Sequence, residues 1–475
     1  MNDKTMNLMR KIKNLSLLDR VLIACVLVIS SPSANAECNG LSCLVCEQLA
    51  DDEHYTEGVM KAMKHITPGH GTWLFRSEYD LSNEFGLPKA FRSDFKRLVS
   101  EFNRRGTEVV FVVQPTRGMM HRDKVLEDKR YGFEFSDARE NLAGFLKQLR
   151  DGGAVVPDVL PLVDNPSENE YFFRRDHHWT PDGAKKTAQI VAASIKSLPA
   201  YQDIEPKSYV TEKGTVIPKD GTMNRSLRHI CGNNYGMQYV QGYQTVPADS
   251  DEDALFGDPA DPEVVLVGTS NSAERDDDYK NYNFSGFLKQ ALEVDILNYA
   301  LPGAGQEGAL LQYLLSDDYL IENPPKILIW ELPASYHLDD EKIYRQLIPA
   351  IKGGCDASQQ VVLSKEHALP ALAKEQRMEI LSNTGSTQKQ LVNFKGFLEL
   401  EFSDKNIKDF YVITYFDNGA RDKVWFRRTG IVDGGKFYLE VSQDKRFKNA
   451  NLMSIFIESS EPVEKASTLK AGLCI

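Results

Sequence analysis

The chain has 475 residues, of which 42% are hydrophobic and 26% are charged, as is usual for soluble globular proteins. This length exceeds that of one ordinary domain and predicts two. The formal net charge of −12 at pH 7 excludes nucleic-acid binding through the overall electrostatic field of the protein.

The first residues have the pattern of a secretory signal. Five basic side chains lie between Lys4 and Arg20, and an apolar run at residues 21–29 and the triplet Ala34-Asn35-Ala36 follow. We therefore expect residues 1–36 to be a signal peptide cleaved after the triplet. The apolar run is too short for a good transmembrane helix, and an uncleaved anchor is the alternative. Five basic and two acidic residues leave with the signal, so the formal charge would go from −12 to −15.

The cysteines suit a compartment in which disulfides persist. Removing Cys25 with the signal leaves six of the seven cysteines: Cys38, Cys43, Cys46, Cys231, Cys355 and Cys474. The early cluster has the spacings C-x4-C and C-x2-C with no matching distal pair, which disfavours a zinc site. Structural bridges are the favoured use, and the sequence alone leaves their pairing open.

Strand and helix patterns alternate along the first two thirds of the chain. An amphipathic segment at 90–105 precedes "EVVFVVQPT" at 108–116, a continuous apolar run closed by proline. Similar apolar runs lie at 155–160, 264–267, 294–297 and 327–330, and helical patterns lie at 181–197 and 283–292. This alternation predicts an α/β domain whose mostly parallel sheet is covered on both faces.

The pattern changes near Cys355. "EKIYRQLIPAIKGG" and "KEHALPALAKEQRMEILSN" are polar and favour helix. They precede the alternating segments "DFYVITYFD", "KVWFRRTGIV", "KFYLEVS" and "NLMSIFIES", with turns at Asn418-Gly419 and Asp433-Gly434-Gly435. These segments predict an antiparallel β-sandwich. We expect the α/β domain to cover residues 37–345 and the sandwich to cover residues 346–475.

Ser270 follows the apolar run at 264–267 in "EVVLVGTSNSAER". A serine just past the C-terminal end of a parallel strand lies where open α/β sheets hold their ligands. Its Oγ can be exposed there, with its own N–H directed at a developing oxyanion. A lone G-x-S motif more often only turns or caps the chain, and Ser272 is the alternative nucleophile.

The stretch "DHHWTPD" places an acid and two imidazoles ahead of a predicted helix. Thr180 suits the N-cap and Pro181 the first helical position, so the preceding residues lie in a loop. In an extended loop Asp176 and His178 project to the same side, and the carboxylate can orient the imidazole that accepts a serine proton. His177 would point elsewhere. Taken alone, this motif would favour a structural role, in which the histidine only makes hydrogen bonds within the loop, over a catalytic role.

A metal site at this stretch would need further ligands. The acids Asp276, Asp277 and Asp278 of "ERDDDY" could be recruited, but they look more like a solvated charge run. No acetyl-CoA motif is visible either. We therefore expect neither a metal nor a cofactor.

Six motifs, in their order, resemble one protein family. "GTWLFRSEYDL", "VVFVVQPTRG", "DHHWTPDGA", "LVGTSNS", "LNYALPGAGQEG" and "ILIWELP" are similar to those of the periplasmic alginate O-acetyltransferases of the AlgX/AlgJ type. These proteins are SGNH-hydrolase-like, with a circularly permuted order in which the Asp-x-His element precedes the serine. The resemblance covers about residues 45–340, and the C-terminal region resembles a carbohydrate-binding module found in part of the family.

The resemblance implies roles for individual residues. Asp176, His178 and Ser270 would form a catalytic triad, Gly303 would be an oxyanion donor, and Tyr336 would contribute to the site. The usual SGNH Gly-x-Asn-Asp block is not visible, so the remaining oxyanion donor is unassigned. The implied disulfides are Cys46 with Cys231 and Cys355 with Cys474, leaving Cys38 and Cys43 for a small local loop.

The segment "KVWFRRTG" presents a face suited to an anionic polysaccharide. In a strand, Lys423, Trp425 and Arg427 would project to one side about 7 Å apart. The indole can cover a sugar ring while the cations meet carboxylates. With the adjacent Arg428 they form the predicted polysaccharide-binding set. An ordinary solvent face of a sandwich is the alternative.

Together these features predict a periplasmic O-acetyltransferase that acetylates alginate through an acetyl-serine intermediate. The resemblance implies a membrane acyl-transfer partner that supplies the acetyl group, together with other proteins of an export complex. The alternatives are a polysaccharide acetylesterase and a non-catalytic polysaccharide-binding scaffold.

Overall fold

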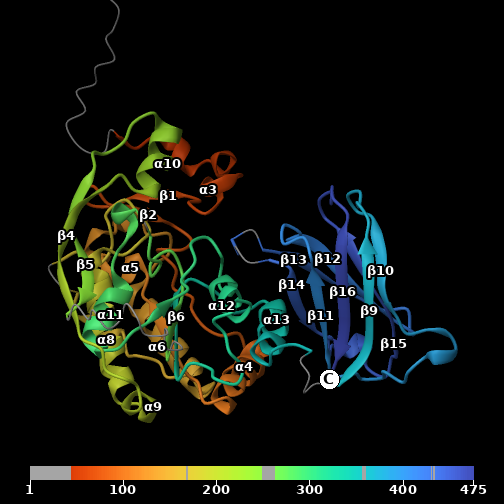
Figure 1. Ribbon diagram of the computed structural model, residues 1–475. Helices are drawn as coiled ribbons and strands as arrows, with labels where there is room; N and C mark the ends of the chain where they lie inside the picture. The colour runs from red at the N-terminus through yellow and green to blue at the C-terminus, as the bar shows by residue number, and fades with distance from the viewer. Residues whose placement is uncertain are drawn as a thin grey trace, which may run out of the picture.

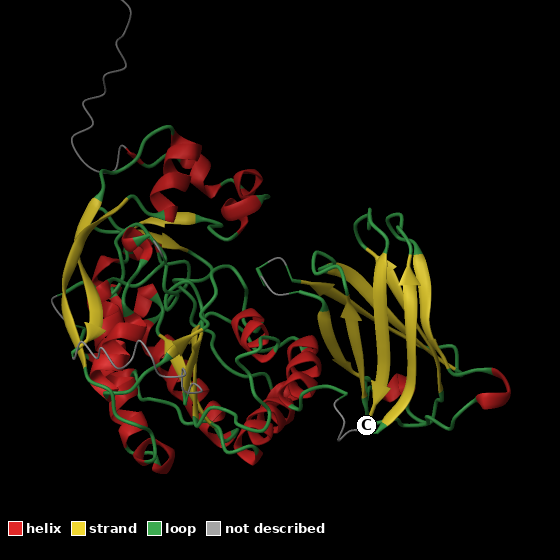
Figure 2. Cartoon of the chain, viewed as in Figure 1, coloured by secondary structure: helices red, strands yellow, loops and turns green. Residues whose placement is uncertain are grey.

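The computed structural model describes residues 44–166, 169–248, 263–275, 277–355, 360–428, 430–431 and 434–475. An α/β body forms first, and a β-sandwich follows on the side of helices α12 (Gly308–Leu314) and α13 (Glu341–Ile351) (Figure 1). Helices gather in the first body and strands dominate the second (Figure 2). The predicted signal peptide, Cys38, Cys43, Asp276 and Asp433 lie outside the described residues. No helix among the described residues is long and apolar enough to cross a membrane.

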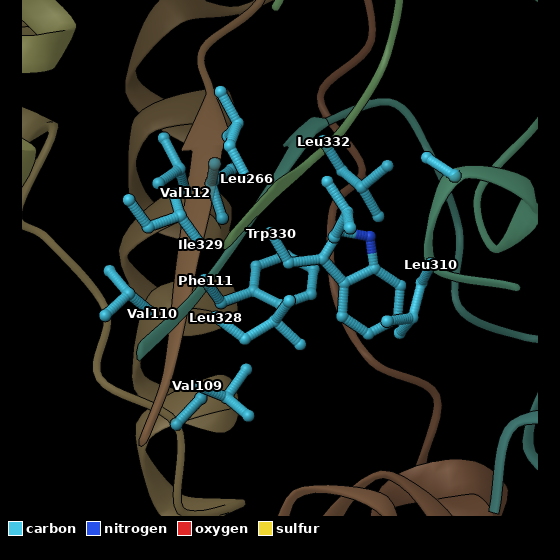
Figure 3. Packing of buried hydrophobic residues seen from close by; sticks show 14 of the residues in the cluster. Val109, Val110, Phe111, Val112, Leu266, Leu310, Leu328, Ile329, Trp330 and Leu332 are labelled. Carbon is cyan, nitrogen blue, oxygen red and sulfur yellow. The ribbon is translucent and has the colours of Figure 1, made fainter. Parts of the chain in front are cut away.

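A parallel sheet lies at the centre of the α/β body, as predicted. Its strand order is β3-β8-β6-β7. The strands are β3 (Glu108–Gln114), β6 (Val264–Val267), β7 (Leu297–Asn298) and β8 (Ile327–Pro333). Nearly every side chain of β3, β6 and β8 is buried, because helices and loops cover both faces of the sheet. Phe111 and Trp330 meet in this core with ring centroids 5.1 Å apart (Figure 3).

Two predicted strands are largely absent. In the run at 155–160 only Val155 makes a β-bridge, to Val110, and helix α7 (Leu160–Asp164) begins where the strand was expected to end. Pro157 has no N–H to give to a ladder, which explains the early end of pairing. In the run at 294–297 only the last residue enters a strand, β7.

The predicted helices form close to their predicted bounds. They are α4 (Arg92–Arg104), α8 (Pro181–Lys196) and α11 (Phe284–Leu292). A further long helix is α6 (Phe135–Asp151). Thr180 caps α8 as predicted, because its Oγ1 accepts a hydrogen bond from the Gly183 N–H at 3.1 Å. This cap fixes the loop that carries Asp176 and His178.

A smaller lobe closes one end of the α/β body. It contains β1 (Ile66–Pro68), β2 (Leu74–Arg76), α3 (Gly58–Lys61) and α10 (Thr222–Cys231), and beside it runs the ribbon of β4 (Tyr209–Lys219) and β5 (Gln238–Pro247). The remaining short helices are α5 (Arg117–Met120) and α9 (Pro199–Gln202). The Cys46–Cys231 disulfide joins this lobe to the first described residues, which is the pairing that the resemblance implied.

The C-terminal body is an antiparallel β-sandwich, as predicted. Its sheets have the orders β10-β15-β12-β13 and β14-β11-β16-β9. The strands are β9 (Val361–Leu369), β10 (Arg377–Ser382), β11 (Phe397–Phe402), β12 (Asp409–Phe416), β13 (Arg421–Arg427), β14 (Lys436–Glu440), β15 (Leu452–Ser459) and β16 (Ser467–Cys474). The prediction of a helix in "KEHALPALAKEQRMEILSN" is wrong, because this stretch contributes to strands β9 and β10. Both strands pair with partners far along the chain, β16 and β15, and these long-range pairings outweigh the local preference.

Helix α13 joins the two bodies. Arg345 makes an ion pair with Asp422 at 2.6 Å and donates to the Glu440 carbonyl at 2.8 Å. The Cys355–Cys474 disulfide ties the segment after α13 to the last strand and matches the implied pairing. The predicted domain boundary at 345/346 falls inside α13 and stays a prediction.

Candidate functional site

Asp176, His178 and Ser270 lie in one hydrogen-bonded row. His178 Nδ1 faces Asp176 Oδ1, and His178 Nε2 lies 2.8 Å from Ser270 Oγ. Asp176 and His178 come from the loop before α8, whereas Ser270 follows the C-terminal end of β6. Asp176 is almost fully buried and Ser270 is half-buried, so the row runs from the interior toward the surface. With Nδ1 protonated, Nε2 can accept the proton of the serine hydroxyl.

Backbone contacts hold the Asp176 loop in this shape. The carboxylate accepts hydrogen bonds from the His178 N–H at 3.1 Å and from the Thr222 N–H at 2.8 Å. The buried Arg117 guanidinium donates to the Asp176 carbonyl at 2.7 Å. Gly221 has φ of +90°, and a Cβ there would lie 2.3 Å from the Arg175 carbonyl oxygen. Only glycine fits that close approach between α10 and the loop.

The charges around the row favour an ionised acid and a neutral imidazole. Burial raises the pKa of Asp176, but Lys219, whose Nζ lies 3.6 Å away, and His178 outweigh it and hold the pKa well below its usual range. Burial lowers the pKa of His178 below its usual value, although Asp176 opposes the shift. A neutral imidazole beside a carboxylate is the state needed to accept a proton.

Ser272, the alternative nucleophile, lies in a different environment. Its Oγ donates to the buried carboxylate of Glu331 at 2.9 Å. The N–H of Thr269 also donates to Glu331, at 2.9 Å, so this carboxylate fixes the turn that carries Ser270. Burial raises the pKa of Glu331. The structure thus brings Ser270, and not Ser272, to His178.

His177 lines the cleft beside Ser270 and its Nδ1 lies 2.8 Å from Thr222 Oγ1, so the imidazole that contacts Ser270 Oγ is that of His178. Asp176, His177 and His178 could nevertheless offer ligand atoms within 4.8 Å of one another. Each of the three side chains already has a hydrogen-bond partner in the row or at Thr222. A metal would have to replace those contacts, and a metal-free site stays a prediction.

A cleft opens beside Ser270 and is lined by Tyr336, whose contribution to the site stays a prediction. Gly303 is exposed in the loop after β7 and does not line this cleft. Sequence reasoning missed most of the wall, because these residues come from separate segments. The missed side chains are Arg76, Tyr79, Asp80, Gln114, Thr116, Arg117, Phe172 and Asn271. Seven of these eight side chains lie in motifs of the family resemblance, which was the available signal. "GTWLFRSEYDL" contains Arg76, Tyr79 and Asp80, "VVFVVQPTRG" contains Gln114, Thr116 and Arg117, and "LVGTSNS" contains Asn271.

The predicted polysaccharide-binding residues Lys423, Trp425 and Arg427 share one face of β13 and line a groove on the sandwich. Trp425 is 41% exposed, and Arg427 lies over its ring at 5.5 Å. Tyr411 of β12, which sequence reasoning missed, stacks beside Trp425 at 5.8 Å and carries Lys423 over its ring at 4.0 Å. These rings and cations form what we call the module groove.

Two features of the module groove differ from the prediction. Arg428 does not lie on this face, because alternation turns it inward. It is buried and donates to Gln346 Oε1 at 2.8 Å, so it ties the sandwich to α13. The charge of the groove is also balanced by four bases and four acids. These are Lys374, Arg377, Lys423 and Arg427 with Glu375, Asp409, Glu458 and Glu461.

Comparisons with known proteins agree with this architecture. Residues 66–334 match the model of an SGNH hydrolase-like domain, acetyltransferase AlgX, and residues 354–475 match that of a C-terminal carbohydrate-binding module. The chain is 33% identical to the alginate biosynthesis protein AlgX of Pseudomonas aeruginosa over 90% of this chain and 88% of that protein. It is 30% identical to the probable alginate O-acetylase AlgJ of the same organism over 57% of this chain and 70% of that protein.

A solved structure supports the same assignment. The chain resembles the structure of Pseudomonas aeruginosa AlgX with a TM-score of 0.80 and 31% identity, covering 91% of this chain and 99% of that one. The match spans both the α/β body and the sandwich. The chain therefore belongs to the AlgX family of SGNH hydrolase-like proteins with a C-terminal carbohydrate-binding module.

Proposed function

We propose that this protein is a polysaccharide O-acetyltransferase that acetylates alginate on mannuronate hydroxyls. The observation that carries the proposal is the contact of His178 with both Asp176 and Ser270. The names of the relatives, alginate biosynthesis protein for AlgX and probable alginate O-acetylase for AlgJ, support the choice of polymer and group.

The reaction would proceed in two steps. Ser270 Oγ attacks the carbonyl carbon of an acetyl donor while His178 Nε2 takes the hydroxyl proton. The tetrahedral intermediate then collapses, the leaving group takes the proton from His178, and acetyl-serine remains. In the second step His178 removes a proton from a mannuronate hydroxyl, whose oxygen attacks the acetyl carbon and releases Ser270. Asp176 orients the imidazole and stabilises its cationic form in both steps.

The module groove would hold the polymer. Trp425 and Tyr411 offer apolar ring surface, and Arg427 is 60% exposed in its side chain. Lys423 is paired with Glu458 at 2.6 Å, whereas Arg427 lies 3.8 Å from Asp409, so a uronate would compete with a closer carboxylate at Lys423 than at Arg427. We therefore assign the rings to sugar contact and Arg427 to carboxylate contact.

The acetyl donor would be a membrane acyl-transfer partner, and other export-complex proteins would complete the assembly. A periplasmic location suits both the disulfides and the predicted signal. An acetylesterase would use the same row of residues, with water in place of the sugar. A non-catalytic scaffold would need only the module groove.

Trapping the intermediate tests the proposal. The protein is mixed with a chromogenic acetyl ester, quenched in acid, and its intact mass is measured. We expect one added acetyl group, mapped by peptide digestion to Ser270, and none in Ser270→Ala. Ser272→Ala is the matched control and should still be acetylated. Absence of acetylation at Ser270 in a protein that turns over the ester would contradict the mechanism.

A further inference from the structure

Two side-chain donors beside Ser270 have no hydrogen-bond acceptor in the part of the chain that the structure describes. They are Gln114 Nε2, at the end of β3, and Thr116 Oγ1. The two residues are only 3% and 6% exposed, and both line the same cleft as Ser270. A buried donor without an acceptor is costly. Its retention at a cleft points to a ligand that supplies the acceptor.

The orientation of the Gln114 amide follows from its neighbours. The Trp179 N–H donates to Asn271 Oδ1 at 3.2 Å, so Asn271 must present its NH2 group on the other side. Asn271 Nδ2 then donates to Gln114 Oε1 at 3.3 Å. Gln114 therefore turns its oxygen toward Asn271, and Nε2 remains available to a further acceptor.

The same residues tie Gln114 to the reacting groups. Trp179 directly follows His178, and Asn271 directly follows Ser270. The indole Nε1 of Trp179 also donates to the Asn271 carbonyl at 2.9 Å, which locks the two loops together. These hydrogen bonds thus fix the positions of His178, Ser270 and the Gln114 amide relative to one another.

We propose that Gln114 Nε2 is an oxyanion donor of this site. As Ser270 Oγ bonds to the acetyl carbon, the carbonyl electron pair moves onto oxygen and the serine proton moves to His178. Gln114 donates to that oxygen until the intermediate collapses and the leaving group departs with the proton. A fixed donor of this kind stabilises the transition state more than the ground state. The inference rests on the proposed role of Ser270 and fills the position that Gly303, outside the cleft, does not.

Substitutions at Gln114 test the proposal with the full chain. Gln114→Glu keeps an oxygen that can accept from Asn271 but removes the donor, and Gln114→Met removes both. We expect both variants to lower kcat for a small acetyl ester by about 10²–10³-fold, with KM changed less than about threefold. Gln148→Glu is the matched control, because Gln148 Oε1 accepts from the Leu87 N–H outside the cleft, and it should keep wild-type kcat.

A purely structural role gives the opposite pattern. If Gln114 served only to hold Asn271, Gln114→Glu would stay within about threefold of wild-type kcat, and that result would overturn the proposal. A second readout does not depend on turnover. In ¹⁵N-labelled protein, a phosphonate adduct on Ser270 should shift the Gln114 side-chain amide protons downfield, and an unshifted amide would also overturn the proposal.

The proposed function fails in a different way. If Ser270 were not the nucleophile, wild-type protein would form no acetyl-serine, and Ser270→Ala would turn over the ester as fast as wild type. Neither result depends on which residue occupies position 114.

Discussion

Replacing Asp176 by asparagine removes one charge from the buried row and replaces the acceptor that faces the Thr222 N–H by an NH2 donor. Asp176 Oδ1 accepts hydrogen bonds from His178 Nδ1–H and from the His178 backbone N–H. Asp176 Oδ2 accepts a hydrogen bond from the Thr222 N–H. An asparagine will therefore keep its oxygen toward His178, where two donors require it. The imidazole keeps its tautomer, and what is lost is the negative charge that stabilises the imidazolium formed during attack.

The size of the effect follows from that charge. Two unit charges about 4 Å apart at an effective dielectric constant of about 20 interact by about 4 kcal/mol. That energy corresponds to about a 10³-fold loss of kcat. The assay is turnover of a chromogenic acetyl ester by Asp176→Asn, with the melting temperature measured alongside because Lys219 loses its carboxylate partner. Asp164→Asn is the control, since Asp164 pairs with Arg139 on the surface.

The pH profile gives a second readout of the same pair. Because burial lowers the pKa of His178, kcat/KM should rise with pH through an apparent pKa below about 6.5 and be flat above neutrality. Asp176 raises the pKa of His178, so in Asp176→Asn the rising limb should shift to lower pH. Two results for a folded Asp176→Asn variant would refute this account. One is a kcat within tenfold of the wild-type value, and the other is a rising part of the pH profile that shifts to higher pH.

Three further predictions concern the nucleophile, metals and the module groove. Ser270→Ala should abolish ester turnover, whereas Ser272→Ala should keep most of it and lose about 1–2 kcal/mol of stability, as measured by urea unfolding, because Glu331 loses a donor. Activity should survive EDTA, and stoichiometric zinc or manganese lost together with activity would argue for a metal site. Replacing Lys423, Trp425 and Arg427 with alanine should weaken mannuronate-oligomer binding, more at low than at high salt, and spare small-ester turnover. Unchanged oligomer affinity in that triple variant would leave the groove without a role.

The parts of the site that local chemistry controls could be predicted from the sequence. The Asp-x-His spacing, the Thr180 cap and the apolar run before Ser270 each act within a few residues, and each takes its expected form. The buried strands β3 and β8 were predicted for the same reason, since continuous apolar runs reflect burial on both faces.

The parts that depend on distant contacts could not be predicted. Gln114 joins the cleft only because β3 ends beside the Ser270 turn, and no spacing in the sequence encodes that meeting. Strand β9 has a polar pattern that favours helix, but pairing with β16, about a hundred residues later, decides its form. Arg428 resembled a surface cation, yet the contact with Gln346 buries it.

Acetylation of a defined acceptor tests the central claim most directly. The protein is incubated with a small acetyl ester and mannuronate oligomers, and the oligomers are weighed by mass spectrometry, with Ser270→Ala in parallel. We expect oligomers that gain whole acetyl groups with wild-type protein and none with Ser270→Ala. Ester turnover that leaves the oligomers unmodified would instead indicate an esterase, and oligomer binding without any turnover would indicate a scaffold.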